Sequence, residues 1–322
     1  MQKSFYRKRQ HIETSWDESA QWYHGLVGEK GMELQRAVVF PQALRLLHLQ
    51  PHERLLDVAC GQGAFCREAV RYCREIAGID ASPQLIALAR NNFLYRNSNL
   101  TSKETSPHIP SFVRRGGGGL VNISKKIKYY VGDARKLPKE VVGERFDAIS
   151  CILAISNIDP IKPVFEECKK ILKPSGRLVL VVAHPCFRIP RQSGWGWDEQ
   201  RKLQYRRVDR YLSEMKIPIQ MHPGGRSHEV TWTFHRPLGV YMRALTEAGF
   251  AVDAMEEWTT NRKSTPGPRA RADMNSKQEI PLFLTMRAIS VNVKAQSFPP
   301  QRDPAFLENK KSRSGTNAMV RQ

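Results

Sequence analysis

The sequence predicts an α/β fold, a Rossmann-like, seven-stranded, mostly parallel sheet with helices on both faces and an inserted cap after the fifth strand. Three observations lead to it. Short apolar runs alternate with longer segments whose apolar residues recur at helical spacing. A glycine turn, Gly61 and Gly63, follows the first apolar run and opens a helix. The second and third runs end in Asp80 and Asp133. Because ligands bind at the carboxyl ends of the strands in such sheets, we expect these residues to share one site.

The strands are predicted from apolar runs of strand length. In the first run, Leu55, Leu56 and Val58 have the bulk of a strand that is buried on both faces. The last two runs follow a predicted helix that ends before Gly249. The expected strands are 54–59, 75–80, 127–131, 146–152, 177–183, 250–257 and 281–288.

The helices carry start signals or an apolar stripe. Ser82 is a suitable N-cap, and Pro83 suits the first helical position that follows it. Val164, Phe165 and Cys168 fall on one side of a later helix. The expected helices are 13–25, 32–47, 63–74, 83 to about 91, 160–172 and 237–248.

Composition divides the chain into segments. Residues 1–50 hold the two leading helices, and 51–288 hold the main domain. Within that domain, 97–128 contain prolines and four consecutive glycines and are predicted to be a flexible insertion. Residues 186–236 interrupt the strand–helix alternation with a basic, Trp- and Tyr-containing stretch, which predicts a cap with a short hairpin. Residues 289–322 lack apolar periodicity and are expected to be a disordered basic tail.

This order of motifs resembles the class I S-adenosylmethionine-dependent methyltransferases, and in particular their small-molecule members. The matching elements are Asp57 with Gly61 and Gly63, then Asp80, then Asp133-Ala134, then Phe146-Asp147, and finally Lys173-Pro174-Ser175-Gly176-Arg177-Leu178 before the fifth strand. The resemblance covers residues 55 to 184. Ala59 departs from it, because many members have the first glycine of the turn there. A methyl group is tolerated at this position if φ is negative.

The resemblance implies that S-adenosylmethionine is the cofactor and that 1–50 lie over the cofactor cleft of a methyltransferase domain at 51–288. It implies that Asp57 orients the glycine turn, that Asp80 accepts from the ribose hydroxyls and that Asp133 meets the adenine amino group. The cofactor-binding residues that it implies are Asp57, Ala59, Gly61, Gly63, Asp80, Ala81, Asp133, Ala134 and Cys151.

Two histidines are candidates for a catalytic base on the acceptor side. His184 follows the fifth strand, and His235 lies beside the predicted cap hairpin. An imidazole titrates near neutrality and therefore suits proton transfer. For each, a structural histidine bonded to a backbone group is the alternative. Tyr23 is a weaker candidate.

The net charge of +20 raises the question of a polyanionic partner. The excess of Lys and Arg falls in the two ends of the chain, the insertion, the cap and the loop before the last strand. The segments that carry the motifs are nearly neutral. A solvated periphery is therefore favoured over a nucleic-acid footprint, and we expect the cap residues Trp195, Trp197 and Trp232 to shape an acceptor pocket instead of stacking on bases.

The six cysteines include no C-x-x-C pair, so no zinc or other metal site is predicted. Small buried thiols fit a reducing compartment. The N-terminus lacks the apolar core of a secretory signal, and no apolar run is long enough to span a bilayer. A cytoplasmic protein is expected.

The leading functional hypothesis is an enzyme, a methyltransferase that acts on a small organic acceptor. One alternative is an RNA or protein methyltransferase that docks through the basic periphery, and another is a non-catalytic cofactor-binding protein. Residues 154–157 lack the Pro-Pro-aromatic motif of methyltransferases that act on base or glutamine nitrogens. A dehydrogenase is disfavoured because the third glycine of its motif is replaced by Cys66. The acceptor, the methylated atom, the use of a base and the oligomeric state stay open.

Overall fold

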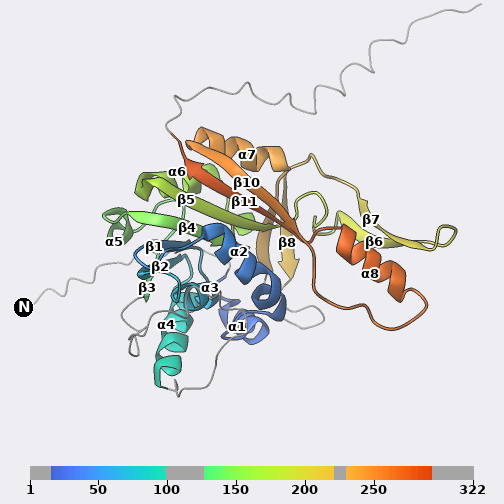
Figure 1. The fold of residues 1–322 in the computed structure, drawn as a ribbon, viewed down its shortest axis with the longest axis horizontal. Helices are drawn as coiled ribbons and strands as arrows, with labels where there is room; N and C mark the ends of the chain where they lie inside the picture. The colour runs from blue at the N-terminus through green and yellow to red at the C-terminus, as the bar shows by residue number, and fades with distance from the viewer. Residues whose placement is uncertain (1–15, 99–126, 221–229, 292–322) are drawn as a thin grey trace, which may run out of the picture. The chain divides into compact units, whose positions relative to one another are not determined.

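The computed structural model describes residues 16–98, 127–220 and 230–291. Its centre is a seven-stranded sheet in the order β10-β11-β5-β4-β1-β2-β3 (Figure 1). Neighbouring strands from β3 to β5 are parallel, whereas β11 is antiparallel to both β5 and β10. The strands of this sheet are β1 (Arg54–Val58), β2 (Glu75–Asp80), β3 (Ile127–Val131), β4 (Phe146–Ile152), β5 (Leu172–Ala183), β10 (Phe250–Trp258) and β11 (Phe283–Ser290). The predicted fold class is confirmed.

Helices cover both faces of the sheet. Successive strand residues point to opposite sides, so a strand of consecutive apolar residues has a face to bury on each side. Along β5, Leu178 and Leu180 face one hydrophobic cluster and Val179 and Val181 face the other. The first cluster includes residues of α5 (Lys139–Val142), α6 (Lys162–Ile171) and α7 (Leu238–Glu247). The second includes residues of α2 (Phe40–Leu47), α3 (Ala64–Ala69) and α4 (Pro83–Ser98). The sheet is therefore the middle layer of three.

The leading segment differs in detail from the expected pair of helices. α1 is Ala20–Val27, and the second expected helix is divided into a π-helix, η1 (Gln35–Val39), followed by α2. Apolar spacing alone does not distinguish a π turn from an α turn, so the sequence predicted one continuous helix. A short 3₁₀ turn, η4 (Ile155–Asn157), follows β4.

The described residues of the cap form two hairpins, although one was expected. β6 (Ser193–Asp198) pairs with β7 (Leu203–Val208), and β8 (Met215–Gln220) pairs with β9 (Val230–His235). β6 was missed because its residues, SGWGWD, include two glycines and show no alternation of apolar and polar groups.

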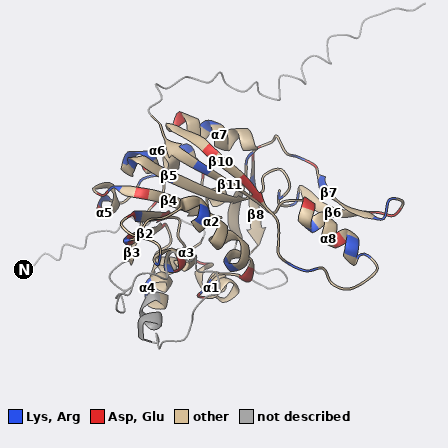
Figure 2. Ribbon diagram, viewed as in Figure 1, with Lys and Arg blue, Asp and Glu red and all other residues tan. Residues whose placement is uncertain are grey.

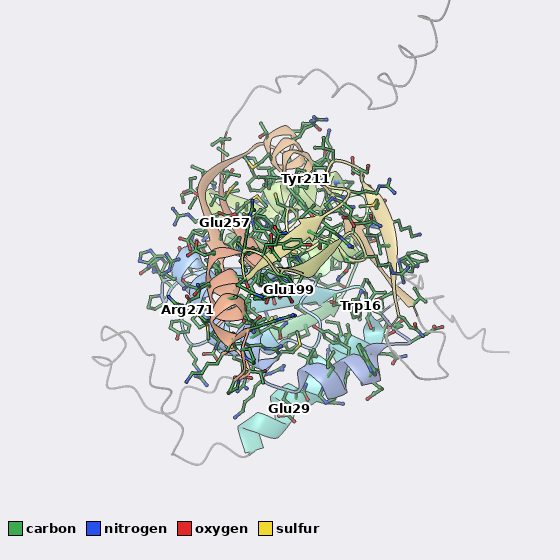
Figure 3. The ribbon with its side chains drawn as sticks, turned by 90° about the vertical axis from the view of Figure 1, so that its right-hand side faces the viewer. Trp16, Glu29, Glu199, Tyr211, Glu257 and Arg271 are labelled. Carbon is green, nitrogen blue, oxygen red and sulfur yellow. The ribbon has the colours of Figure 1, made fainter. Side chains whose placement is uncertain are left out.

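A helix was also missed in the segment between β10 and β11, which was expected to be a polar loop. α8 (Ala270–Glu279) lies beside the β6–β7 hairpin, and Figure 3 labels Arg271 of this helix and Glu199 of the hairpin. Arg269, just before the helix, pairs with Glu199 at 2.8 Å. Acidic and basic residues are mixed along the helix (Figure 2). Among its residues only Ser276 is buried, so it has no apolar stripe from which a helix is predicted.

Much of the expected insertion and the expected tail lie at 99–126 and 292–322, outside the described residues, and their disorder stays a prediction. In the part of the chain that is described, no helix combines the length and apolarity that crossing a membrane requires. The same residues contain no group of three His, Cys, Asp or Glu that could hold a metal ion.

The turn after β1 has an unusual backbone. Gly61 and Gly63 have φ values of 55° and 76°, and Ala59 has a φ of 54°. These values are in the left-handed region, which strains a residue with a Cβ atom. The expectation that the Ala59 methyl group is accommodated by a negative φ is therefore wrong. The loop is strained at the position where many members of the family that the sequence resembles have glycine.

Replacing Ala59 by Gly should raise the free energy of unfolding by about 0.5–1 kcal/mol. Relief of the left-handed strain gives about 1–2 kcal/mol, and the greater freedom of glycine in the unfolded chain offsets about half of it. Urea titrations measure the change. The same substitution at Ala87, which is exposed and helical, should instead lower stability by about 0.5–1 kcal/mol. A loss of stability in both variants would contradict the strain at Ala59.

Candidate functional site

A cavity of about 760 Å³ opens at the carboxyl ends of β1, β2, β3 and β4. Its floor is formed by the loops that follow these strands, and its walls come from the leading segment and from the β8–β9 hairpin. The volume is in the upper part of the range of about 300–1,000 Å³ that is usual for ligand pockets. There is therefore room for two molecules of moderate size.

The glycine turn brings main chain to the floor. A Cβ atom on Gly61 would meet only the Tyr23 ring, at 3.9 Å, so this position is open toward the cavity. Gly63 has a different role, because a Cβ atom there would clash with the hydroxyl group of Tyr129. Gly63 is thus required for packing against β3, and it does not line the cavity.

Asp80, the last residue of β2, links two loops. Its Oδ2 accepts from the Gly61 N–H at 2.8 Å, and its Oδ1 accepts from the Ser82 N–H at 2.9 Å. The side chain is buried but lines the cavity. Burial raises the pKa of Asp80 to about 6, although both amide hydrogen bonds lower it. At neutral pH a buried negative charge therefore lies at the floor.

Asp57, in β1, is less exposed to solvent than Asp80. Its Oδ1 accepts from the Ser150 hydroxyl at 2.7 Å, and its Oδ2 accepts from the Cys66 thiol at 3.2 Å. Burial raises the pKa of Asp57 to about 7, and the charge of Asp80 adds to this shift. The carboxyl group is therefore poised to change protonation state near neutral pH.

Asp133, after β3, has a partner that the sequence analysis missed. Arg135 donates to both of its carboxylate oxygens at 2.7 to 3.0 Å and also to the main-chain oxygen of Asp159 at 2.7 Å. Burial alone would raise the pKa of Asp133, but the hydrogen bonds and charge of Arg135 outweigh it and lower that pKa. The Asp-x-Arg spacing was the available signal for this pair.

Most of the expected cofactor residues meet in the cavity. Those that line it are Asp57, Ala59, Gly61, Asp80, Ala81, Asp133 and Ala134. Cys151 does not line it, because its side chain is buried in the cluster beneath β4, while the next residues, Ile152 and Leu153, reach the cavity. The individual roles assigned to these residues stay predictions.

Neither candidate base lines the cavity, which corrects the expectation that they flank an acceptor. His184 Nε2 is bonded to Glu257 Oε1 at 2.6 Å, and its Nδ1 accepts from the Cys186 N–H at 3.2 Å. His235 Nε2 donates to the main-chain oxygen of Tyr211 at 2.7 Å. Burial lowers the pKa of each. Both histidines fit the structural alternative.

An aromatic wall faces the acidic floor. It is formed by Trp16, Tyr23 and Phe40 of the leading segment and by Trp232 and Phe234 of β9. Burial and the nearby Asp80 raise the pKa of Tyr23, which keeps its phenol neutral.

Of the three cap tryptophans expected here, only Trp232 lines the cavity. Trp195 and Trp197 are on β6, outside the lining, and stack with arginines instead. Lys216 of β8 is part of the lining, and its Nζ lies 4.3 Å from the centroid of the Trp232 ring.

The residues present fit S-adenosylmethionine. The molecule has a sulfonium and an ammonium cation, a ribose diol and an adenine amino group. The carboxylates of Asp57, Asp80 and Asp133 line the cavity as acceptors and negative charges, and Gly61 leaves space for a close approach to the main chain. The aromatic wall is left for a second molecule.

Replacing Asp57 by Asn should reduce the dependence of stability on pH. Because burial raises the folded-state pKa from 3.8 to about 7, the unfolded chain loses this proton first as pH rises. Protonated Asp57 therefore contributes stability to the wild-type protein below pH 4, and this contribution is lost as the pH rises toward 7. The quantity to compare is the unfolding free energy of Asp57→Asn minus that of wild type. This difference should be larger at pH 8 than at pH 5 by roughly 1–3 kcal/mol.

Guanidinium titrations at both pH values measure this difference. Asp253→Asn, on the edge strand β10, is the matched control and should differ from wild type equally at the two pH values. An Asp57→Asn difference that is the same at both pH values would show that Asp57 ionises as easily in the folded protein as in the unfolded chain.

Comparison with known proteins agrees with this geometry. Residues 56–180 match the family model described as "Methyltransferase domain". A demethylmenaquinone methyltransferase of Tropheryma whipplei is 27% identical over 44% of this chain and 47% of its own length. A 23S rRNA (uracil(1939)-C(5))-methyltransferase of Polaromonas is 37% identical over 24% of this chain and 16% of its own. The chain thus spans less than half the length of these curated relatives.

Solved structures share the fold over a larger part of the chain. An S-adenosylmethionine-dependent methyltransferase of Mesorhizobium loti matches with a TM-score of 0.53 and 24% identity, covering 77% of this chain and 96% of that one. A putative methyltransferase of the same kind from Listeria monocytogenes matches with a TM-score of 0.55 and 20% identity, covering 80% and 100%. The matching family model shows that residues 56–180 form a methyltransferase domain, and the solved structures show that this domain has the Rossmann-like fold of S-adenosylmethionine-dependent methyltransferases.

Proposed function

We propose that the protein transfers the methyl group of S-adenosylmethionine to a small organic acceptor. The observation that carries this proposal is that one cavity joins an acidic floor, suited to the cofactor, to an aromatic wall, suited to a flat apolar acceptor. When bound, the cofactor supplies an activated methyl group on a sulfonium, so the protein's main tasks are positioning and exclusion of water.

The chain's own residues divide these tasks. Asp80 accepts hydrogen bonds from the ribose hydroxyls while it holds the Gly61 and Ser82 amides in place. Asp57 faces the cationic part, and Asp133, oriented by Arg135, accepts from the adenine amino group. The buried carboxylates are costly to ionise alone, and a cationic ligand offsets that cost.

The leading segment closes the opposite side. Gln62 of the glycine turn donates to the main-chain oxygen of Gly28 at 2.6 Å, and Arg67 of α3 donates to the main-chain oxygen of Glu29. These bonds hold the segment that carries Tyr23 and Phe40 close to the floor. The acceptor is then enclosed between aromatic rings and the cofactor, which favours a near-attack geometry.

A small acceptor is supported by the names of two relatives, the demethylmenaquinone methyltransferase above and a ubiquinone biosynthesis O-methyltransferase of Xanthomonas oryzae, 26% identical over 39% of this chain and 41% of its own. The rRNA methyltransferase relative favours a second candidate, an RNA acceptor, but over a shorter stretch. Trp195 and Trp197 are outside the cavity, so they offer an RNA no stacking surface beside the reacting groups.

Replacing Asp80 by Ala should weaken S-adenosylmethionine binding about 5- to 150-fold, which corresponds to about 1–3 kcal/mol for polar groups left without a partner. Asp80→Asn should also weaken binding, because an amide retains one acceptor oxygen but loses the negative charge. Isothermal titration calorimetry measures both. Asp253→Ala, far along the sheet edge, should bind like wild type. Wild-type affinity in both Asp80 variants would refute the role assigned to Asp80.

The acceptor is tested with isotopically labelled cofactor. We expect label to enter a small molecule in a metabolite extract, and much less with the Asp80→Ala variant. Total RNA and tRNA are incubated in parallel. Label that enters RNA and not the metabolite fraction would overturn the small-molecule proposal while leaving the methyltransferase assignment intact.

A further inference from the structure

The segment after β5 builds a second cluster of functional groups outside the cavity. It follows His184 and leads into the β6–β7 hairpin, and its members are Arg188, Trp195 and Arg206. None of the three lines the cavity described above. The cluster therefore has no part in the binding of cofactor or acceptor proposed there, and its chemistry requires a separate account.

Both guanidinium groups lie against the same indole ring. The Cζ atom of Arg188 is 5.4 Å from the ring centroid of Trp195, and that of Arg206 is 5.2 Å from it. A ring attracts a cation through its face, so Trp195 fixes two positive charges close together.

The two arginines differ in how many of their N–H groups are used. Arg206 donates through Nε to the main-chain oxygen of Phe187 at 2.7 Å and through Nη2 to the Ser193 hydroxyl at 2.9 Å. The side chain of Arg188 donates to none of the described residues, and its Nε is buried without a hydrogen-bond partner. A guanidinium has five N–H donors, so most donors of the pair make no hydrogen bond to a described residue.

The pair also lacks a counterion among the described residues. Neither arginine has an ion pair there, and Glu257, the carboxylate beside His184, is bonded to that imidazole. Burial, with the charge of Arg206 adding to it, lowers the pKa of Arg188 to about 10, which still leaves the group charged at neutral pH. Two like charges that are half-buried without an anion are unfavourable, and a bound anion would offset this cost.

We propose that Arg188 and Arg206, held against Trp195, bind the phosphate group of a small phosphorylated molecule. A phosphate monoester carries a charge of about −1.5 to −2 at neutral pH, which matches two guanidinium groups better than a single carboxylate does. The planar fork of arginine also matches the spacing of phosphate oxygens. The site is separate from the methyl-transfer cavity, so it stands whether or not the proposed acceptor class is correct.

Arg188→Gln is the variant that tests this site. The Arg188 side chain makes no hydrogen bond to a described residue, so the substitution removes none of the hydrogen bonds that stabilise the described fold. Calorimetry with inorganic phosphate, at constant ionic strength adjusted with chloride, should show affinity reduced at least about tenfold relative to wild type. Phosphate should raise the thermal midpoint of wild type and leave that of Arg188→Gln nearly unchanged. Without phosphate, the variant should be about as stable as wild type, because removal of a like-charge contact offsets the loss of the attraction between Arg188 and Trp195.

Arg201→Gln is the matched control, since Arg201 is exposed on the same hairpin and the change of charge is identical. It should respond to phosphate like wild type. An equal response in all three proteins would overturn the site. A short RNA oligomer is the second probe: tight RNA binding that Arg188→Gln abolishes would overturn the assignment to a small phosphorylated molecule and assign the cluster to nucleic-acid phosphates.

Discussion

The candidate site depends on the two hydrogen bonds that the carboxylate of Asp80 accepts. This carboxylate accepts from the main-chain N–H of Gly61, after β1, and from that of Ser82, before α4, so one side chain joins two loops that are distant in the sequence. The left-handed turn at Gly61 directs its amide toward this carboxylate. A change at Asp80 would therefore alter the shape of the floor as well as its charge. The charge of the floor and the geometry of the two loops therefore depend on the same residue.

The acidic floor gains its chemistry from burial. Asp57 and Asp80 are both buried and both have raised pKa values, near 7 and near 6, because desolvation outweighs the hydrogen bonds that they accept. Asp133 is less buried and has Arg135 beside it, so its pKa shifts in the opposite direction. Acids that end three neighbouring strands thus differ in their readiness to ionise. A cationic ligand on this floor would stabilise the ionised forms of the two deeper groups.

The cap separates two surfaces that share a composition of aromatic and basic residues. The β8–β9 hairpin contributes Trp232 and Lys216 to the cavity, whereas Trp195 of the β6–β7 hairpin contacts the two arginines of a different cluster. The α8 helix lies beside the β6–β7 hairpin, and Arg269, just before the helix, pairs with Glu199 of the hairpin. Tryptophans that look equivalent in the sequence therefore serve a pocket in one case and a charged surface cluster in the other.

The sequence by itself determined the sheet and the location of the site. Apolar runs at strand and helix period define β1 to β5, and acids at the ends of parallel strands must converge at one edge, so Asp57, Asp80 and Asp133 could be assigned to one cavity without coordinates. Only the tertiary structure decided the left-handed φ of Ala59, the partners of His184 and His235, and the place of Trp195. Each of these depends on backbone geometry or on contacts between residues that are not sequence neighbours, such as Glu257 with His184. Local sequence patterns show how apolar and polar residues alternate within a segment. They do not show which residue, distant in the sequence, will form a hydrogen bond with a buried nitrogen or pack against an indole ring.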